Sequence, residues 1–147
     1  MGLIDDIGPG SVAVDTAVFI YFIEEAPDFL PIVAPLFQDA DTGNRELVTS
    51  AVTLLEVLVV PYRASDHTLA ERYEALLTRS RGVRLIDLTR DQLLSAAQLR
   101  AATGVRTPDA LQMAAALSAR CTAFITNDRR LPSVPGLRII QLRSYLA

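Results

Sequence analysis

The sequence predicts an α/β fold, a three-layer α/β/α arrangement around a central, mainly parallel sheet of four to five strands. Short apolar segments that read as strands alternate with longer segments of helical periodicity. Half of the 147 residues are hydrophobic, and the sequence contains neither an internal repeat nor a low-complexity stretch. We therefore expect one domain over residues 1–147 with a sizeable core.

The first half of the chain supplies two expected strands and three expected helices. The expected elements are a strand at 12–14, a helix after Asp15, a helix at 31–39, a strand at 46–49 and a helix from 51 to about 60. Ser50 is the expected N-cap of the last of these helices. Pro61 is expected to stop the same helix, because proline lacks the backbone donor that continues it.

The second half alternates in the same way. The expected elements are helices at about 68–79, 89–104 and 107–119 and strands at 83–88, 122–125 and 137–142. Capping-box spacing marks two helix starts, at Thr68 and at Thr89. The third start, Thr107-Pro108-Asp109, combines a cap residue, a proline in the first turn and an acid near the helix N-terminus.

Four acidic residues are candidate site residues: Asp15 and Asp128 directly after expected strands, Asp109 at the start of a helix, and Glu56 within a helix. In open α/β sheets, ligands gather at the carboxyl ends of the strands, where Asp15 and Asp128 are expected. Carboxylates that lie together repel one another unless a cation compensates. Mg²⁺ or Mn²⁺ is the natural cation for oxygen ligands, and such ions assist hydrolysis of phosphodiesters.

Each acid could also have a purely structural role. Asp109 can interact with the dipole of its helix, Asp15 can cap the helix that follows it, and Asp128 can be a turn residue. A structural role fits Glu56 less well, because it lies within the apolar segment AVTLLEVLVV. A charge there is costly if it is buried without a partner. The four acids as a set favour a metal site.

Other catalytic classes have little support. His67 is the only histidine, so neither a zinc site nor a Ser-His-Asp triad is expected. Without any lysine, the chain lacks a residue that P-loop enzymes and receiver domains require. A phosphatase of the haloacid-dehalogenase type needs a second acid where Ala17 stands. Arg129 and Arg130 are either a solvated surface or contacts to a phosphate backbone beside Asp128.

The net charge and the cysteine content give information about binding partners and cellular location. The formal charge of -3 is untypical of a nucleic-acid binder, although acids gathered in one pocket can produce it. The single cysteine, Cys121, cannot form an internal disulfide and is expected to be a buried small residue. With neither a signal-peptide pattern nor a long apolar run, we expect a cytoplasmic protein without membrane contact.

Several segments together resemble the PIN-domain family. VAVDTAVFIYFIE is similar to the opening strand and helix of PIN domains, and SAVTLLEVL, RTPDALQMAAAL, AFITNDRRL and PGLRIIQL resemble the segments that follow in order. The resemblance assigns the family's metal-site roles to Asp15, Glu56, Asp109 and Asp128. It assigns to Thr126, of the Thr-x-Asp motif, the orientation of an acid or a bound water.

The resemblance also implies a function. Bacterial PIN domains of this size are most often VapC-type toxins of toxin–antitoxin pairs. This implies an endoribonuclease dependent on Mg²⁺ or Mn²⁺ that cuts an RNA substrate, forms a homodimer and is held inactive by a cognate antitoxin protein. The alternative is a non-catalytic PIN-like module that binds RNA or protein. Arg106 and Thr107, just before the third acid, depart mildly from the family pattern.

Overall fold

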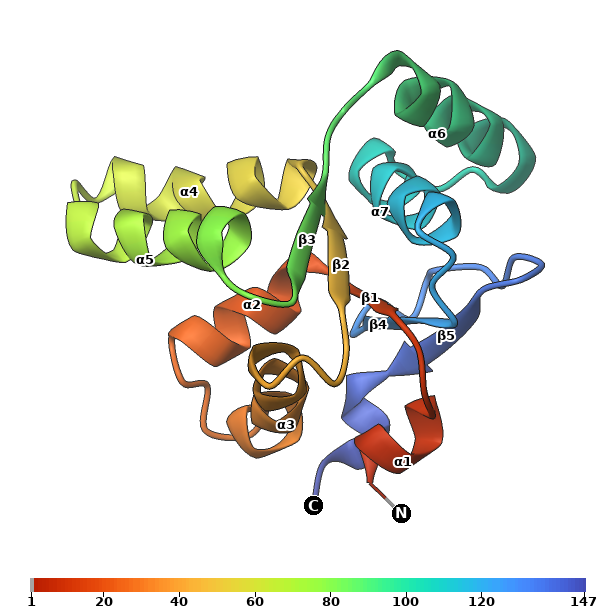
Figure 1. The fold of residues 1–147 in the computed structure, drawn as a ribbon. Coiled ribbons are helices and arrows are strands. Elements are labelled where there is room, and N and C mark those ends of the chain that lie inside the picture. The colour runs from red at the N-terminus through yellow and green to blue at the C-terminus, as the bar shows by residue number, and fades with distance from the viewer. Residues whose placement is uncertain (1) are drawn as a thin grey trace.

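The computed structural model describes residues 2–147, and its strands form one parallel sheet between two groups of helices (Figure 1). Within these residues the sheet has five strands in the order β3-β2-β1-β4-β5. The strands are β1 (Val12–Val14), β2 (Leu47–Ser50), β3 (Val83–Ile86), β4 (Ala123–Thr126) and β5 (Arg138–Gln141). The predicted fold class, a parallel sheet of four to five strands between helical layers, is therefore confirmed.

The strand order reverses beside β1. The chain moves outward from β1 to β2 and β3, and it then returns to the other side of β1 to form β4 and β5. All residues of β1, β2 and β4 are buried, whereas the edge strands β3 and β5 are partly exposed. Helices at such a reversal leave on opposite sides of the sheet, so that a crevice opens at the strand ends.

Helices cover both faces of the sheet. They are α1 (Leu3–Ile7), α2 (Thr16–Ile23), α3 (Leu30–Asp41), α4 (Val52–Arg63), α5 (His67–Arg79), α6 (Arg90–Thr103), α7 (Thr107–Ser118) and the 3-10 helix η1 (Leu142–Tyr145). Figure 1 shows α2 to α5 on one side and α6 and α7 on the other. Across residues 2–147, every helix is too short or too polar to cross a membrane.

The side-chain alternation of β1 divides the core into two parts. Val12 and Val14 pack into the larger cluster, together with residues of α2 and α3. Ala13 points to the opposite face and joins the cluster that contains Met113 and Ala114 of α7. Successive residues of a strand face opposite sides of a sheet, so three apolar residues serve both layers. Both faces of this strand have to be apolar.

Two expectations about α4 and α5 are wrong. Pro61 does not stop α4, which continues to Arg63 with Pro61 in its last turn. Proline removes only its own backbone donor, and the carbonyl of Pro61 still accepts a hydrogen bond from Asp66 N at 2.8 Å. The cap of α5 is Asp66 and not Thr68, because Asp66 Oδ1 accepts a hydrogen bond from Leu69 N at 3.1 Å.

The starts of α6 and α7 give one confirmation and one correction. Thr89 is the N-cap of α6, as predicted, and its Oγ1 accepts from Gln92 N at 3.2 Å. The N-cap of α7 is Arg106 and not Thr107, which is already helical. The hydroxyl of Thr107 accepts from Arg100 Nη1 at 3.1 Å and is not used as a cap.

Smaller differences lie at other element ends. The N-cap of α4 is Ala51, although Ser50 Oγ still accepts from Val52 N at 3.2 Å. The third strand ends at Ile86, opposite Ser50, because β2 offers no further partner. The sequence does not predict helix α1, since five residues carry too little periodicity.

Gly82 (φ +78°) lets β3 pass close to α3, because a Cβ at this position would lie 2.3 Å from Ala40 O.

Candidate functional site

A pocket of ≈ 230 Å³ opens at the strand reversal. All four predicted acids line it, and the complete lining consists of Asp15, Thr16, Ala17, Glu56, Arg106, Pro108, Asp109, Gln112 and Asp128. The acids come from four segments: the start of α2, the middle of α4, the first turn of α7 and the loop after β4. The structure therefore brings the four acids together, although they are far apart in the sequence.

Asp15 is the most enclosed of the four acids. It occupies the N-cap position of α2, but its side chain makes no capping hydrogen bond. Instead, Asp15 Oδ2 accepts a hydrogen bond from the hydroxyl of Thr126, the fifth predicted site residue, which is fully buried at the end of β4. Within residues 2–147, the other oxygen, Oδ1, is buried without any hydrogen-bond partner. Such an oxygen is a natural ligand for a cation.

Burial raises the pKa of Asp15 to about 6, from an ordinary value of 3.8. The hydrogen bond from Thr126 lowers this pKa again, as do the nearby backbone N–H groups of Val18, Asn127 and Ala17. These groups do not offset the loss of hydration. A positive charge in the pocket would stabilise the ionised form of Asp15.

Glu56 lies at the exposed edge of the pocket. Its Oε1 accepts a hydrogen bond of 2.6 Å from Thr16 Oγ1, so the residue after Asp15 holds the carboxylate of Glu56. Thr53, one turn earlier on α4, is fully buried, and its hydroxyl lies 3.3 Å from that of Thr16. The apolar segment around Glu56 does not bury it: Glu56 is exposed, and Leu55 beside it is 65% exposed.

Sequence reasoning missed Gln112, which is almost completely buried beneath the pocket. Its Oε1 accepts from Ser50 N at 3.1 Å and from Thr49 Oγ1 at 3.2 Å. Its Nε2 donates to Thr53 Oγ1 at 2.6 Å. Gln112 therefore ties α7, which carries Asp109, to β2 and to α4, which carries Glu56. A signal existed, because this amide interrupts the otherwise apolar segment ALQMAAAL, as Glu56 interrupts its own helix.

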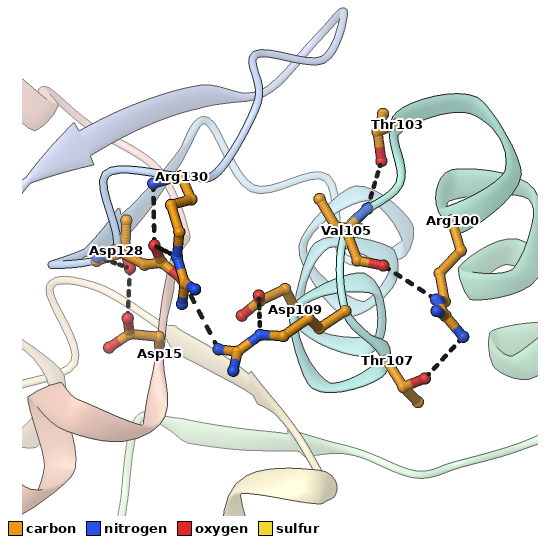
Figure 2. A network of polar contacts seen from close by, with 10 residues as sticks. Asp15, Arg100, Thr103, Val105, Thr107, Asp109, Asp128 and Arg130 are labelled. Atoms are coloured by element: carbon orange, nitrogen blue, oxygen red, sulfur yellow. Dashed lines mark hydrogen bonds and ion pairs between the residues drawn. The ribbon is translucent and has the colours of Figure 1, made fainter.

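Two arginines lie beside Asp109 and Asp128, and Arg106 forms ion pairs with both acids. Arg130 contacts Asp128 through three hydrogen bonds, from its backbone N at 2.9 Å, Nε at 3.1 Å and Nη2 at 3.2 Å. The guanidinium of Arg106 lies 3.6 Å from Asp109 Oδ2 through Nε and 4.0 Å from Asp128 Oδ2 through Nη2. Figure 2 shows Asp15, Asp128 and Arg130 on one side of the site and Asp109 across from them.

These contacts move two pKa values in opposite directions. Burial, and then the charge of Asp128, raises the pKa of Asp109. The hydrogen bonds from Arg130 lower the pKa of Asp128 below its ordinary value. Asp128 is therefore anionic at neutral pH.

The carboxylate oxygens that line the pocket are suitable ligands for a divalent cation, and two arginines neutralise part of the negative charge of these carboxylates. Such oxygen ligands are the type that Mg²⁺ and Mn²⁺ prefer, and Asp15 Oδ1 is buried and free to bind one. Among the residues that the structure describes, no three His, Cys, Asp or Glu side chains converge closely enough to hold a metal ion. Mutual repulsion favours this separation, since carboxylates approach closely only around a cation.

Cys121 does not take part in the site. It is buried beside the start of β4, as predicted, and burial raises the pKa of its thiol to about 12. A protonated, buried thiol is a poor nucleophile. Cys121 is therefore not a candidate nucleophile.

Solved structures with the same fold include several toxin–antitoxin proteins. VapBC2 from Rickettsia felis, bound to a DNA fragment from its promoter, is 18% identical (TM-score 0.62) and covers 89% of this chain and 98% of its own. VapC20 from Mycobacterium tuberculosis, described as a sarcin–ricin loop cleaving toxin, is 18% identical (TM-score 0.62; 77% and 86% covered). VapBC-5 from the same organism is 24% identical (TM-score 0.58; 90% and 99% covered).

Sequence comparison identifies the family directly. No curated protein sequence matches the chain. The family model of the PIN domain matches residues 12–137, which extend from β1 to the residue before β5 and include all four acids. The chain therefore belongs to the PIN domain family.

Proposed function

We propose that this PIN domain is an endoribonuclease that uses Mg²⁺ or Mn²⁺ to hydrolyse RNA phosphodiester bonds. The main support is the pocket at the strand reversal, which Asp15, Glu56, Asp109 and Asp128 all line and in which Asp15 Oδ1 has no hydrogen-bond partner among residues 2–147. Paired carboxylates at such a site are suited to phosphodiester hydrolysis, whereas the described pocket contains no histidine or cysteine. The four acids are the proposed catalytic and metal-binding residues.

The proposed roles follow from burial and hydrogen bonding. Asp15, Asp109 and Asp128 would hold the cation, with Thr126 keeping Asp15 oriented through its hydroxyl. Glu56, exposed and held by Thr16, would bind the cation or position the attacking water. A bound divalent ion supplies positive charge that activates the water and stabilises the phosphate in the transition state. Arg129 and Arg130 remain candidates for contacts to the RNA backbone.

The experiment is cleavage of end-labelled total RNA by the purified protein with Mg²⁺ or Mn²⁺. Asp109→Asn should abolish the discrete fragments, and so should EDTA. Asp91→Asn is the matched control, because Asp91 also lies in the first turn of a helix but is exposed and outside the pocket. Cleavage by the Asp109→Asn protein at the wild-type rate would show that the pocket is not the active centre.

We further propose that the protein is the toxin of a type II toxin–antitoxin pair in the cytoplasm. This rests on the solved structures of similar fold, two of which are of VapBC toxin–antitoxin systems. The expected partner is a small antitoxin encoded next to this gene. Co-expression of the neighbouring reading frame with a tagged copy of this chain should give a complex that no longer cleaves RNA.

A homodimer is the third part of the proposal. The apolar residues Val18 and Phe19 are buried in the core and cannot contribute to such an interface. Leu55, Val59 and Tyr62 instead form an exposed apolar stripe on α4, with exposed fractions of 65%, 42% and 55%. Their i, i+4, i+7 spacing puts them on one helix face. Light scattering should give a dimer mass for the wild type and a monomer mass for Leu55→Glu.

The second candidate is a non-catalytic PIN module that binds RNA or protein. The contacts of Arg106 and Arg130 favour it, because they neutralise Asp109 and Asp128 without any metal. A module of this kind would bind RNA equally well in EDTA and would leave every RNA intact. Metal-dependent cleavage in the experiment above rules this candidate out.

A further inference from the structure

Arg106 places a positive charge inside the acid pocket. Its guanidinium lies between two acids from different segments, 3.6 Å from Asp109 Oδ2 and 4.0 Å from Asp128 Oδ2. Asp109 belongs to α7, and Asp128 follows β4. The same pocket contains Asp15, whose Oδ1 has no partner within the described residues 2–147. Arg106 therefore lies where a cation shared by the acids would be bound.

The backbone on both sides of Arg106 is anchored (Figure 2). Arg100 Nε donates to Val105 O at 2.9 Å, and Arg100 Nη1 donates to Thr107 Oγ1 at 3.1 Å. Val105 N also donates to Thr103 Oγ1 at 3.4 Å. One arginine of α6 thus fixes the residues before and after Arg106. The position of the Arg106 side chain beside the acids is set by this turn between α6 and α7.

Arg130 differs from Arg106 in two respects. Among the described residues, its ion pair and its hydrogen bonds through Nε and Nη2 are with Asp128, two residues before it in the sequence, so they do not bridge two segments. It lines a neighbouring hollow, on the side of Gly104 and Leu131, and not the pocket that contains all four acids. Arg106 is therefore the arginine that lines the same pocket as all four acids.

We propose that Arg106 is an internal counter-ion of the acid pocket, which a divalent cation has to displace in order to bind. The inference rests on the proposed metal site and adds a competitor that belongs to the chain itself. Arg106 is 66% exposed, and ion pairs at such exposure contribute little, so a divalent cation can replace the guanidinium. The competition lowers the apparent affinity for metal and leaves a mobile guanidinium beside the filled site.

The test is Mn²⁺ binding measured by isothermal titration calorimetry, without RNA. Arg106→Gln should bind Mn²⁺ about threefold to tenfold more tightly than the wild type, the range expected from losing two exposed ion pairs. Arg106→Lys, which keeps the charge but not the planar fork, should fall between them. Arg129→Gln is the control, because it removes the same charge from an exposed residue next to Asp128 that lies outside the pocket lining.

The outcomes separate this inference from the proposed function. Unchanged or weaker Mn²⁺ binding by Arg106→Gln overturns the counter-ion role, as does an equal gain in Arg129→Gln, which would reflect net charge alone. If the wild type binds Mn²⁺ and Asp15→Asn does not, the proposed metal site stands whatever Arg106 does. If neither Arg106→Gln nor the wild type binds Mn²⁺, the metal site and the counter-ion role both fail. Unfolding curves should confirm that the variants fold.

Discussion

Thr126 donates its hydroxyl hydrogen to Asp15, and the same oxygen accepts a hydrogen bond from Asp128 N at 3.0 Å. One buried hydroxyl therefore joins the ends of β1 and β4 and holds two acids of the pocket. Thr126→Val keeps the shape but removes both bonds. We expect it to lower the free energy of unfolding by about 1–3 kcal/mol, since a buried carboxylate and a backbone N–H lose their partner.

Thr126→Ser is the control for this change, because it keeps the hydroxyl and removes one methyl group. Urea denaturation monitored by circular dichroism measures both variants. The serine variant should stay within about 1 kcal/mol of the wild type. Equal losses in the two variants would show that packing, and not the hydroxyl, accounts for the effect.

Asp15 should make the metal-free protein sensitive to pH. Its pKa is raised to about 6 in the folded state, so its stabilising contribution is complete below 3.8 and is lost as the pH rises through 6. Two units of pKa correspond to about 3 kcal/mol in total. In EDTA, Asp15→Asn should therefore gain stability relative to the wild type, and the gain should grow by about 1 kcal/mol between pH 5 and pH 7. A gain independent of pH would refute the buried-carboxylate assignment.

Gln112 should be essential to the structure under the pocket. Gln112→Leu leaves the buried Ser50 N without its partner, which costs about 1–3 kcal/mol, whereas Thr53 Oγ1 keeps its hydrogen bond with Thr49 Oγ1. Gln98→Leu makes the same substitution at an exposed position of α6 and should change stability by less than about 0.5 kcal/mol. Denaturant unfolding of both proteins tests the comparison. Similar losses at the two positions would contradict the assigned contacts.

Gly82 and Gly136 make it possible to measure the cost of a steric overlap apart from the cost of a positive φ. Both have positive φ, +78° and +83°, but only at Gly82 would a Cβ overlap another segment, 2.3 Å from Ala40 O. Gly136→Ala should cost about 1–2 kcal/mol from the backbone conformation alone. Gly82→Ala should cost more than about 3 kcal/mol, because α3 or β3 has to move as well. Thermal unfolding in parallel measures the difference, and equal shifts would refute the packing argument.

Much of the fold follows from local patterns. The sequence predicts strand β1 at its observed bounds, because three apolar residues directly before an acid are typical of a short buried strand. The Thr89 cap and Gly104 predict helix α6, and both act as expected. The strand order is not predictable in the same way. The sequences of short apolar strands such as β2 and β4 are too similar to show which strand lies beside which. The packing of the helices determines which strands are adjacent in the sheet.

The same distinction between local patterns and tertiary contacts applies to the candidate site. The four acids are identifiable because charge beside apolar segments is conspicuous, and the structure brings them into one pocket. The contacts of Gln112 and Arg106 are not identifiable in this way, because each depends on which helix faces meet in space. In the sequence Arg106 is only a departure from the family pattern, and its contact with Asp128 joins segments distant in sequence. Local patterns locate the acids but not the groups that surround them.

The pairing of β1 with β4 has a consequence during synthesis of the chain. Asp15 and Thr126 are 111 positions apart, and β1 finds its second neighbour only when β4 exists. At about 5–20 residues per second, the ribosome needs roughly 5–20 s to make the intervening segment. A nascent chain therefore carries its first acid throughout elongation without an assembled pocket. If the pocket cleaves RNA, the ribosome that makes this protein is protected from it until β4 and Asp128 have been synthesised.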